Sequence, residues 1–232
     1  MSTVIIAAAG YIINDYYDVK IDLINKPERV VIGKEVARRY ALLLHSVLSM
    51  VGIGLGFLLS WEIGVINFFS VFLLWWYSND LKRQPFIGNF VVALLTGLSI
   101  FMINVLYPGR QSLVTIYSLF AFAMTLVREV VKDMEDLKGD NTFGCKTLPI
   151  TWGIRKTKWF LYLLLLLFFV SVVQINLIFR ELPMPYFFIF LFGPLLLLLV
   201  RLIRADTKKD FYQLSQWCKV ILLLGIASMV FI

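Results

Sequence analysis

Apolar stretches separated by short polar segments run along almost the whole chain. They predict eight membrane-spanning helices, at about 1–14, 40–61, 63–78, 86–107, 112–128, 158–179, 184–204 and 214–232. A helix of about 20 residues crosses a hydrocarbon core of roughly 30 Å, so most segments are long enough, while 1–14 and 63–78 are short. Tight connections at 61–63 and 180–183 predict antiparallel hairpins, and the polar stretches 18–39 and 129–157 predict long loops that carry the chemistry.

The composition supports this pattern. The 232 residues are 60% hydrophobic with a mean hydropathy of +0.83, which is more apolar surface than a soluble domain needs. Trp and Tyr gather near the segment ends, as in the interfacial belts of membrane proteins. No secretory signal peptide is evident. We therefore expect an all-α, polytopic helical bundle that forms one integral membrane domain over residues 1–232.

The net charge of +7 follows the same topology. With the predicted spans, 19 of the 22 basic residues fall on one side of the membrane. Such an excess of Lys and Arg marks the cytoplasmic side. The basic balance thus needs no nucleic acid as a partner. We expect a bacterial plasma membrane with the polar loops in the cytoplasm.

Two clusters of aspartates have the same spacing, D-x2-D-x3-D. The first comprises Asp15, Asp18 and Asp22 after Asn14, and the second comprises Asp133, Asp136 and Asp140. At about 100° per residue, each trio lies on one helical face. Six carboxylates at a membrane edge would repel one another unless they share a cation. The repeat predicts two pseudo-repeated halves that face each other across a central cavity.

This chemistry suits Mg²⁺ and a diphosphate. Mg²⁺ binds one or two carboxylates and completes its shell with water and phosphate. Metals held by both clusters would stabilise the charge that builds on a departing pyrophosphate. We expect nearby basic and aromatic residues to complete the diphosphate site: Tyr77, Lys82, Arg83, Arg29, Arg128 and Lys132. Apolar walls would keep the alkyl fragment dry.

Three segments resemble a known family in order and spacing. They are Asn14-Asp15-x2-Asp18-x3-Asp22-x2-Asn25-x-Pro27-x-Arg29, then Tyr77-Ser78-x2-Leu81-Lys82-Arg83 with Gly88-Asn89, and then Asp133-x2-Asp136-x3-Asp140 with Gly144-x2-Thr147-Leu148-Pro149. Together they resemble the UbiA-type intramembrane prenyltransferases over essentially the whole chain. Where the family often has Arg-Pro, this chain has Arg29-Val30.

The resemblance implies the fold, the metal and the site. Family members have nine spans and bind Mg²⁺ through both acidic motifs, here Asn14, Asp15, Asp18, Asp22, Asp133, Asp136 and Asp140. Asp18, Asp136 and Lys82 would be the catalytic residues. Because this chain has eight expected spans, we expect the first family helix to be missing and the chain to be incomplete at its N-terminus.

The resemblance also implies the substrates, a prenyl diphosphate and a lipophilic acceptor within the membrane lipid. The sequence shows no sign of an obligate protein partner. The sequence from Ala7 to Asp15 is most similar to that of the branch that uses geranylgeranylglycerol phosphate. An aromatic quinone precursor, such as dihydroxynaphthoate or hydroxybenzoate, remains an alternative acceptor.

Other classes stay open at this stage. A CDP-alcohol phosphotransferase also uses clustered aspartates, although in one continuous motif. A cation transporter would carry acids in mid-membrane, and a non-catalytic membrane protein would not need its aspartates. Some of these residues also have a purely structural explanation. Lys82 and Arg83 could only set the orientation of the chain in the membrane, and Cys145 and Cys218 are expected to be packing residues.

Overall fold

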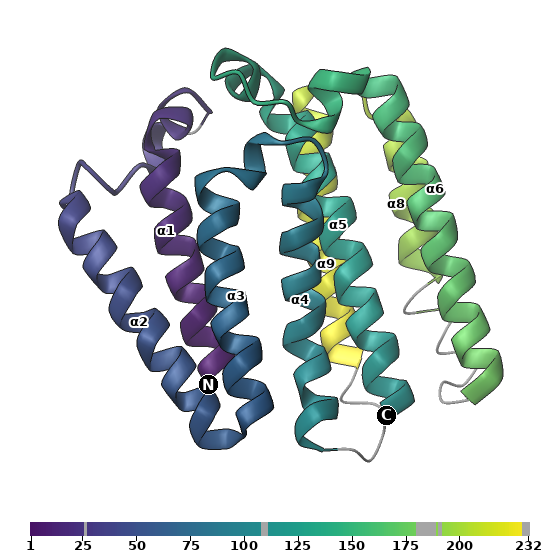
Figure 1. Cartoon of the computed structure of the whole chain (residues 1–232). Helices are drawn as coiled ribbons and strands as arrows, with labels where there is room; N and C mark the ends of the chain where they lie inside the picture. The colour runs from purple at the N-terminus through teal and green to yellow at the C-terminus, as the bar shows by residue number, and fades with distance from the viewer. Residues whose placement is uncertain (26, 108–110, 180–188, 190–191, 229–232) are drawn as a thin grey trace. The chain divides into compact units, whose positions relative to one another are not determined.

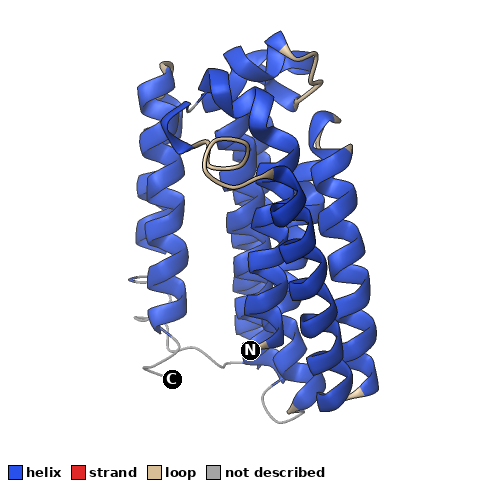
Figure 2. Ribbon diagram, turned by 90° about the vertical axis from the view of Figure 1, so that its left-hand side faces the viewer, coloured by secondary structure: helices blue, strands red, loops and turns tan. Residues whose placement is uncertain are grey.

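The computed structural model describes residues 1–25, 27–107, 111–179, 189 and 192–228. The elements in chain order are α1 (Ser2–Asn25), η1 (Pro27–Arg29), α2 (Arg38–Leu59), α3 (Trp61–Asn79), η2 (Leu81–Arg83), α4 (Ile87–Leu106), α5 (Gln111–Thr142), α6 (Leu148–Phe179), α8 (Gly193–Arg204) and α9 (Lys208–Ser228) (Figure 1). Within the described residues, extended pairing is limited to one isolated bridge between Ile32 and Val36, and Figure 2 accordingly shows helices joined by loops. The predicted all-α fold is confirmed.

Four of the described helices are long and apolar enough to cross a membrane by length and composition. They cover Arg38–Leu59, Ile87–Leu106, Ser112–Thr142 and Leu148–Ile178. They overlap the expected spans at 40–61, 86–107, 112–128 and 158–179, although the last two helices extend well beyond the expected bounds. The other expected spans correspond to α1, α3, α8 and α9. Residues 184–188 and 190–191 of the seventh span, residues 229–232 of the eighth and the hairpin predicted at 180–183 lie outside the described part of the chain.

The two long polar loops were predicted wrongly in their extent. α1 continues to Asn25 and α5 continues to Thr142, so both aspartate clusters lie within helices. The reason is visible in α5, where Val127, Val130 and Met134 keep a helical spacing through the charged stretch and are all buried. α6 already begins at Leu148, and its backbone departs from helical angles at Gly153.

The chain divides into two compact units, which are described separately. Unit 1 comprises Met1–Val91 and Lys138–Lys146, and unit 2 comprises Val92–Leu137 and Thr147–Ile232. In unit 1, α1, α2 and α3 pack against one another. Their outer surfaces expose large apolar side chains such as Leu43, Met50 and Phe69, as expected for helices that face lipid.

Small residues bring α2 and α3 together at their tight connection. A Cβ added at Gly56 would lie 2.5 Å from Asn67 Nδ2 and 3.1 Å from Gly64 Cα. Asn67 is buried and donates to the Gly52 carbonyl over 3.0 Å. Ser60 separates the two helices, and its Oγ accepts from Ile63 N at the start of α3. Close backbone approach through small residues is typical of membrane helices, because lipid provides no hydrophobic drive for their association.

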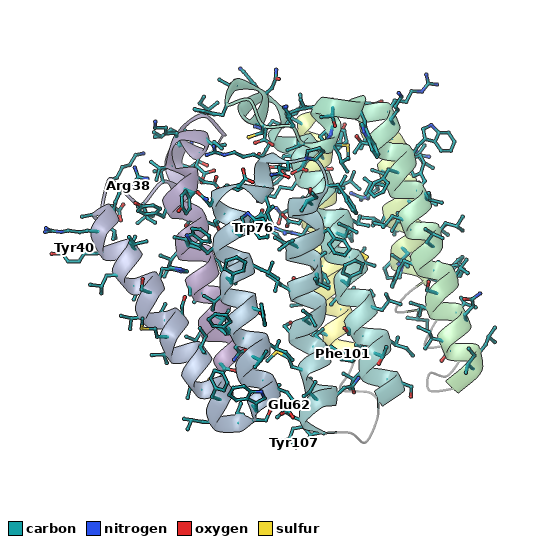
Figure 3. The ribbon with its side chains drawn as sticks, viewed as in Figure 1. Arg38, Tyr40, Glu62, Trp76, Phe101 and Tyr107 are labelled. Atoms are coloured by element: carbon teal, nitrogen blue, oxygen red, sulfur yellow. The ribbon has the colours of Figure 1, made fainter. Side chains whose placement is uncertain are left out.

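The other end of unit 1 is fastened through α1. Arg38 donates to the Tyr16 carbonyl over 3.1 Å, and its guanidinium lies 4.5 Å from the Tyr16 ring centroid. Nearer the middle, His45 Nδ1 lies 3.0 Å from the Ala9 carbonyl. Figure 3 shows Arg38 at one end of the three-helix unit and Glu62 at the opposite end. The aspartates of α1 therefore lie toward the Arg38 end.

Unit 2 is held by its own polar contacts. Ser118 of α5 donates to the Gly97 carbonyl of α4 over 2.8 Å, and the Tyr117 and Ser228 hydroxyls lie 3.0 Å apart between α5 and α9. Lys158 of α6 forms an ion pair of 2.9 Å with Asp206, which lies between α8 and α9. The first two contacts hold α5, which carries the first part of the second acidic motif.

The close approach of α2 and α3 gives a stability prediction with an internal control. Gly56→Leu should lower the melting temperature in detergent, because overpacking a close contact costs about 1–3 kcal/mol. Gly54 lies on the same helix, and a Cβ added there would meet no atom within 4 Å, so Gly54→Leu should leave the melting temperature unchanged. Equal melting temperatures for both variants would contradict the α2–α3 packing.

Candidate active site

The first acidic motif lies on the last turns of α1. Asp15 is exposed, whereas Asn14, Asp18 and Asp22 are partly buried. The helix is unbroken from Ser2 to Asn25, so the predicted spacing does place Asp15, Asp18 and Asp22 on one face. Polar ligands on a helix are positioned more accurately than ligands on a loop.

Lys82 from η2 reaches this face. Its Nζ lies 2.5 Å from Asp18 Oδ1 and 3.5 Å from Asn14 Oδ1, and only 10% of the Lys82 side chain and 15% of the Asp18 side chain are exposed. Burial lowers the pKa of the Lys82 ammonium, and the charge of Asp18 opposes that shift. The buried ammonium thus depends on the Asp18 carboxylate for compensation.

Further predicted residues share unit 1 with this cluster. Asp22 and Arg83 act electrostatically on Lys82, and Asp140 lies in the segment Lys138–Lys146 that packs within unit 1. Arg83 is exposed, and its carbonyl accepts from Lys146 N over 2.7 Å.

Tyr77 is partly buried near the end of α3. The side chain of Arg29 lies outside the described residues.

The rest of the second motif lies in unit 2. Asp133 is partly buried and Asp136 is buried on α5, with the partly buried Lys132 beside them. Arg128 forms an ion pair with the buried Glu129, and its Nε has no hydrogen-bond partner among the described residues. The expected meeting of the two motifs across a cavity stays a prediction.

The residues present fit a hard cation such as Mg²⁺. Within the described part of the chain, no three His, Cys, Asp or Glu side chains converge tightly enough to form a metal cage by themselves. Mg²⁺ does not need one, because it binds one or two carboxylates and takes its remaining ligands from water and phosphate. Asn14 Oδ1 and Asp18 Oδ1 already converge on one positive charge, that of Lys82. Asn14 and Asp18 therefore offer suitable oxygen ligands, whereas a metal role for Asp15 and Asp22 stays a prediction.

Two residues of this region were not identified as functional from the sequence. Cys145 was interpreted as a packing residue, and it is indeed buried, but it also lies within electrostatic reach of Asp140, Arg83 and Asp18. Gly88 was noted only as part of the central segment. The sequence feature that could have identified Gly88 is its position, three residues after Pro85 and close to the two basic residues of the turn.

Solved structures resemble this chain over nearly its whole length. One, described as a study of digeranylgeranylglyceryl phosphate synthase in membranes, is 26% identical with a TM-score of 0.76, and the match covers 98% of this chain and 83% of that one. A UbiA homologue from Archaeoglobus fulgidus, bound to GPP and Mg²⁺, is 15% identical with a TM-score of 0.67, and 96% of this chain and 83% of that one are covered. The second likeness concerns the fold alone.

Curated relatives match this chain at higher identity. The digeranylgeranylglyceryl phosphate synthase of Sulfurisphaera tokodaii is 40% identical over 212 residues, which are 87% of this chain and 73% of that protein. The enzyme of the same name from Methanosphaera stadtmanae is 42% identical over 152 residues, 66% of this chain and 56% of that protein. The family description "UbiA prenyltransferase family" matches residues 1–224. This integral membrane protein belongs to the UbiA prenyltransferase family.

Proposed function

We propose that the chain transfers a prenyl group, with Mg²⁺, from a prenyl diphosphate to geranylgeranylglyceryl phosphate. The observation that carries the proposal is the cluster of Asn14, Asp18 and Lys82, which gathers oxygen ligands and a cation at one end of a three-helix unit. Carboxylates alone would repel a diphosphate. Carboxylates that hold a metal ion next to a lysine instead form a site that attracts a diphosphate.

The residues divide into two sets. Asn14, Asp15, Asp18 and Asp22, with Asp133, Asp136 and Asp140, would hold Mg²⁺, which supplies neutralisation of the charge on the departing pyrophosphate. Tyr77, Lys82, Arg83, Arg128, Lys132 and Arg29 would bind the diphosphate itself. Lys82 has the best-supported role, because its ammonium is already in place beside Asp18 and largely shielded from water.

The acceptor is proposed from the relatives, which share 40–42% identity and are described as digeranylgeranylglyceryl phosphate synthases. An aromatic acceptor is the second candidate, since the acidic motifs serve the donor rather than the acceptor. The family assignment argues against a CDP-alcohol phosphotransferase or a cation transporter.

From the excess of basic residues on one side of the predicted membrane, we propose that the active site faces the cytoplasm. A bacterial membrane stays a prediction, and the relatives named above are archaeal.

The direct test offers both acceptors to the purified chain in nanodiscs. With labelled geranylgeranyl diphosphate and Mg²⁺, we expect label to enter geranylgeranylglyceryl phosphate and not dihydroxynaphthoate. Product from dihydroxynaphthoate alone would establish the aromatic alternative. Label in neither acceptor, from protein with an intact melting transition, would refute prenyl transfer by this chain.

Asp18→Asn should lower kcat by at least about 10²-fold, because it removes a charge that both the cation site and Lys82 use. The measurement is product formed per minute at saturating substrates, with the melting temperature as a check of folding. Glu35→Gln is the matched control, since Glu35 is an exposed carboxylate of unit 1 that has no part in the proposed site. Its activity should stay within about twofold of the unchanged chain.

Metal removal should separate catalysis from folding. We expect EDTA to abolish prenyl transfer and added Mg²⁺ to restore it, because the carboxylates cannot bind a diphosphate without a shared cation. The melting temperature of the substrate-free protein should not change with EDTA, since Lys82 already compensates Asp18. Full activity after exhaustive chelation would contradict the assigned role of the aspartates.

A further inference from the structure

The turn that carries Lys82 and Arg83 is closed by its own hydrogen bonds. Gln84 Nε2 donates to Asp80 Oδ2 over 2.6 Å, and the amides of Arg83 and Gln84 donate to the carbonyls of Asp80 and Leu81 over 3.0 Å each. The Leu81 side chain is buried below the turn. The backbone of η2 is therefore fixed before any ligand binds.

Gly88, in the first turn of α4, lies directly against this backbone. A Cβ at position 88 would lie 2.7 Å from the Leu81 carbonyl oxygen and 2.8 Å from Lys82 Cα. Both neighbours are backbone atoms, so no side-chain rotation could relieve the overlap. Helix propensity alone would favour alanine at this position, so the glycine serves the contact and not the helix.

The residue before α4 shows the same constraint. Phe86 adopts a φ of 67°, which is rare for an aromatic residue, and its ring lies 5.9 Å from that of Phe90. Backbone conformations of this kind persist only where the surroundings determine them. The amide of Phe90 donates to the Phe86 carbonyl over 2.9 Å, which connects the strained residue to α4.

Two functional segments depend on this turn. Lys82 reaches Asp18 and Asn14 on α1. Next to it, the Arg83 carbonyl accepts from Lys146 N over 2.7 Å, at the end of the segment Lys138–Lys146 that contains Asp140. That segment is folded back by a bond of 3.0 Å from Cys145 N to the Asp140 carbonyl.

We infer that the turn at residues 80–88 positions the diphosphate-binding cation and the end of the second acidic motif together, with Gly88 as the residue that makes this possible. Gly88 is a positioning residue, because it acts through the backbone of η2 and touches no substrate in the proposed scheme. A Cβ at position 88 would shift Lys82 and release the segment around Cys145 at the same time. The inference rests on the proposed function only for its kinetic consequence.

Cysteine alkylation tests the coupling without any enzyme assay. Cys145 and Cys218 are the two cysteines of the chain, and both are buried, the first beside Arg83 and the second in α9 of unit 2. In Gly88→Ala we expect N-ethylmaleimide to label Cys145 about tenfold faster, with Cys218 unchanged as the internal measure of global unfolding. Peptide mass spectrometry reads the two sites separately. Gly54→Ala, at an open position of α2, should alter neither rate.

An unchanged Cys145 rate in Gly88→Ala would overturn the inference. If both cysteines react faster, the milder Gln84→Ala decides, because it removes only the 2.6 Å bond to Asp80. It should then accelerate Cys145 alone by about threefold, as expected for the loss of one hydrogen bond. No acceleration in Gln84→Ala would again overturn the coupling.

The kinetic consequence separates positioning from mere stability. Gly88→Ala should raise KM for the prenyl diphosphate about tenfold and leave KM for the acceptor unchanged, since a small displacement of a binding group is costly. A general loss of stability would instead lower the amount of active enzyme and leave both KM values unchanged, which would contradict positioning. If Cys145 responds but the unchanged chain transfers no prenyl group, the proposed function fails and the coupling stands.

Discussion

The pairing of Lys82 with Asp18 is the interaction on which the site depends. Both side chains are largely shielded from water, and a buried charge without a partner is strongly destabilising. The pair therefore needs an accurate geometry, which α1 supplies for Asp18 and the closed turn after α3 supplies for Lys82. The same requirement explains why the turn tolerates the positive φ of Phe86 and places a glycine against its backbone.

Unit 1 uses close backbone approach for two different purposes. At the Glu62 end, Gly56 and Gly64 let α2 and α3 meet, and the buried Asn67 adds a hydrogen bond to the Gly52 carbonyl. Membrane helices need such contacts, because they cannot gain much by exchanging lipid for protein. At the polar end, Gly88 holds a functional backbone in place. One residue type thus stabilises the unit and positions its chemistry.

Much of this architecture could be predicted from the sequence. The duplicated aspartate spacing identified Asp18, and the central segment identified Lys82, which the structure brings into contact. The extent of the loops could not be predicted from hydropathy. Charged residues at 129–142 lower the mean hydropathy of a segment whose buried helical face includes Val130 and Met134. The role of Gly88 was also hidden, since it depends on two backbone atoms that only the folded turn brings near.

Helix α5 shows how the second motif obtains its geometry. Its residues up to Leu137 belong to unit 2, whereas Lys138–Lys146 belong to unit 1. The helix is continuous to Thr142, so the residues of the second motif follow a helical spacing. That spacing is set by local hydrogen bonds alone. The helix does not determine where Asp140 lies relative to the first motif. Within unit 1, the hydrogen bond from Lys146 N to the Arg83 carbonyl provides that constraint.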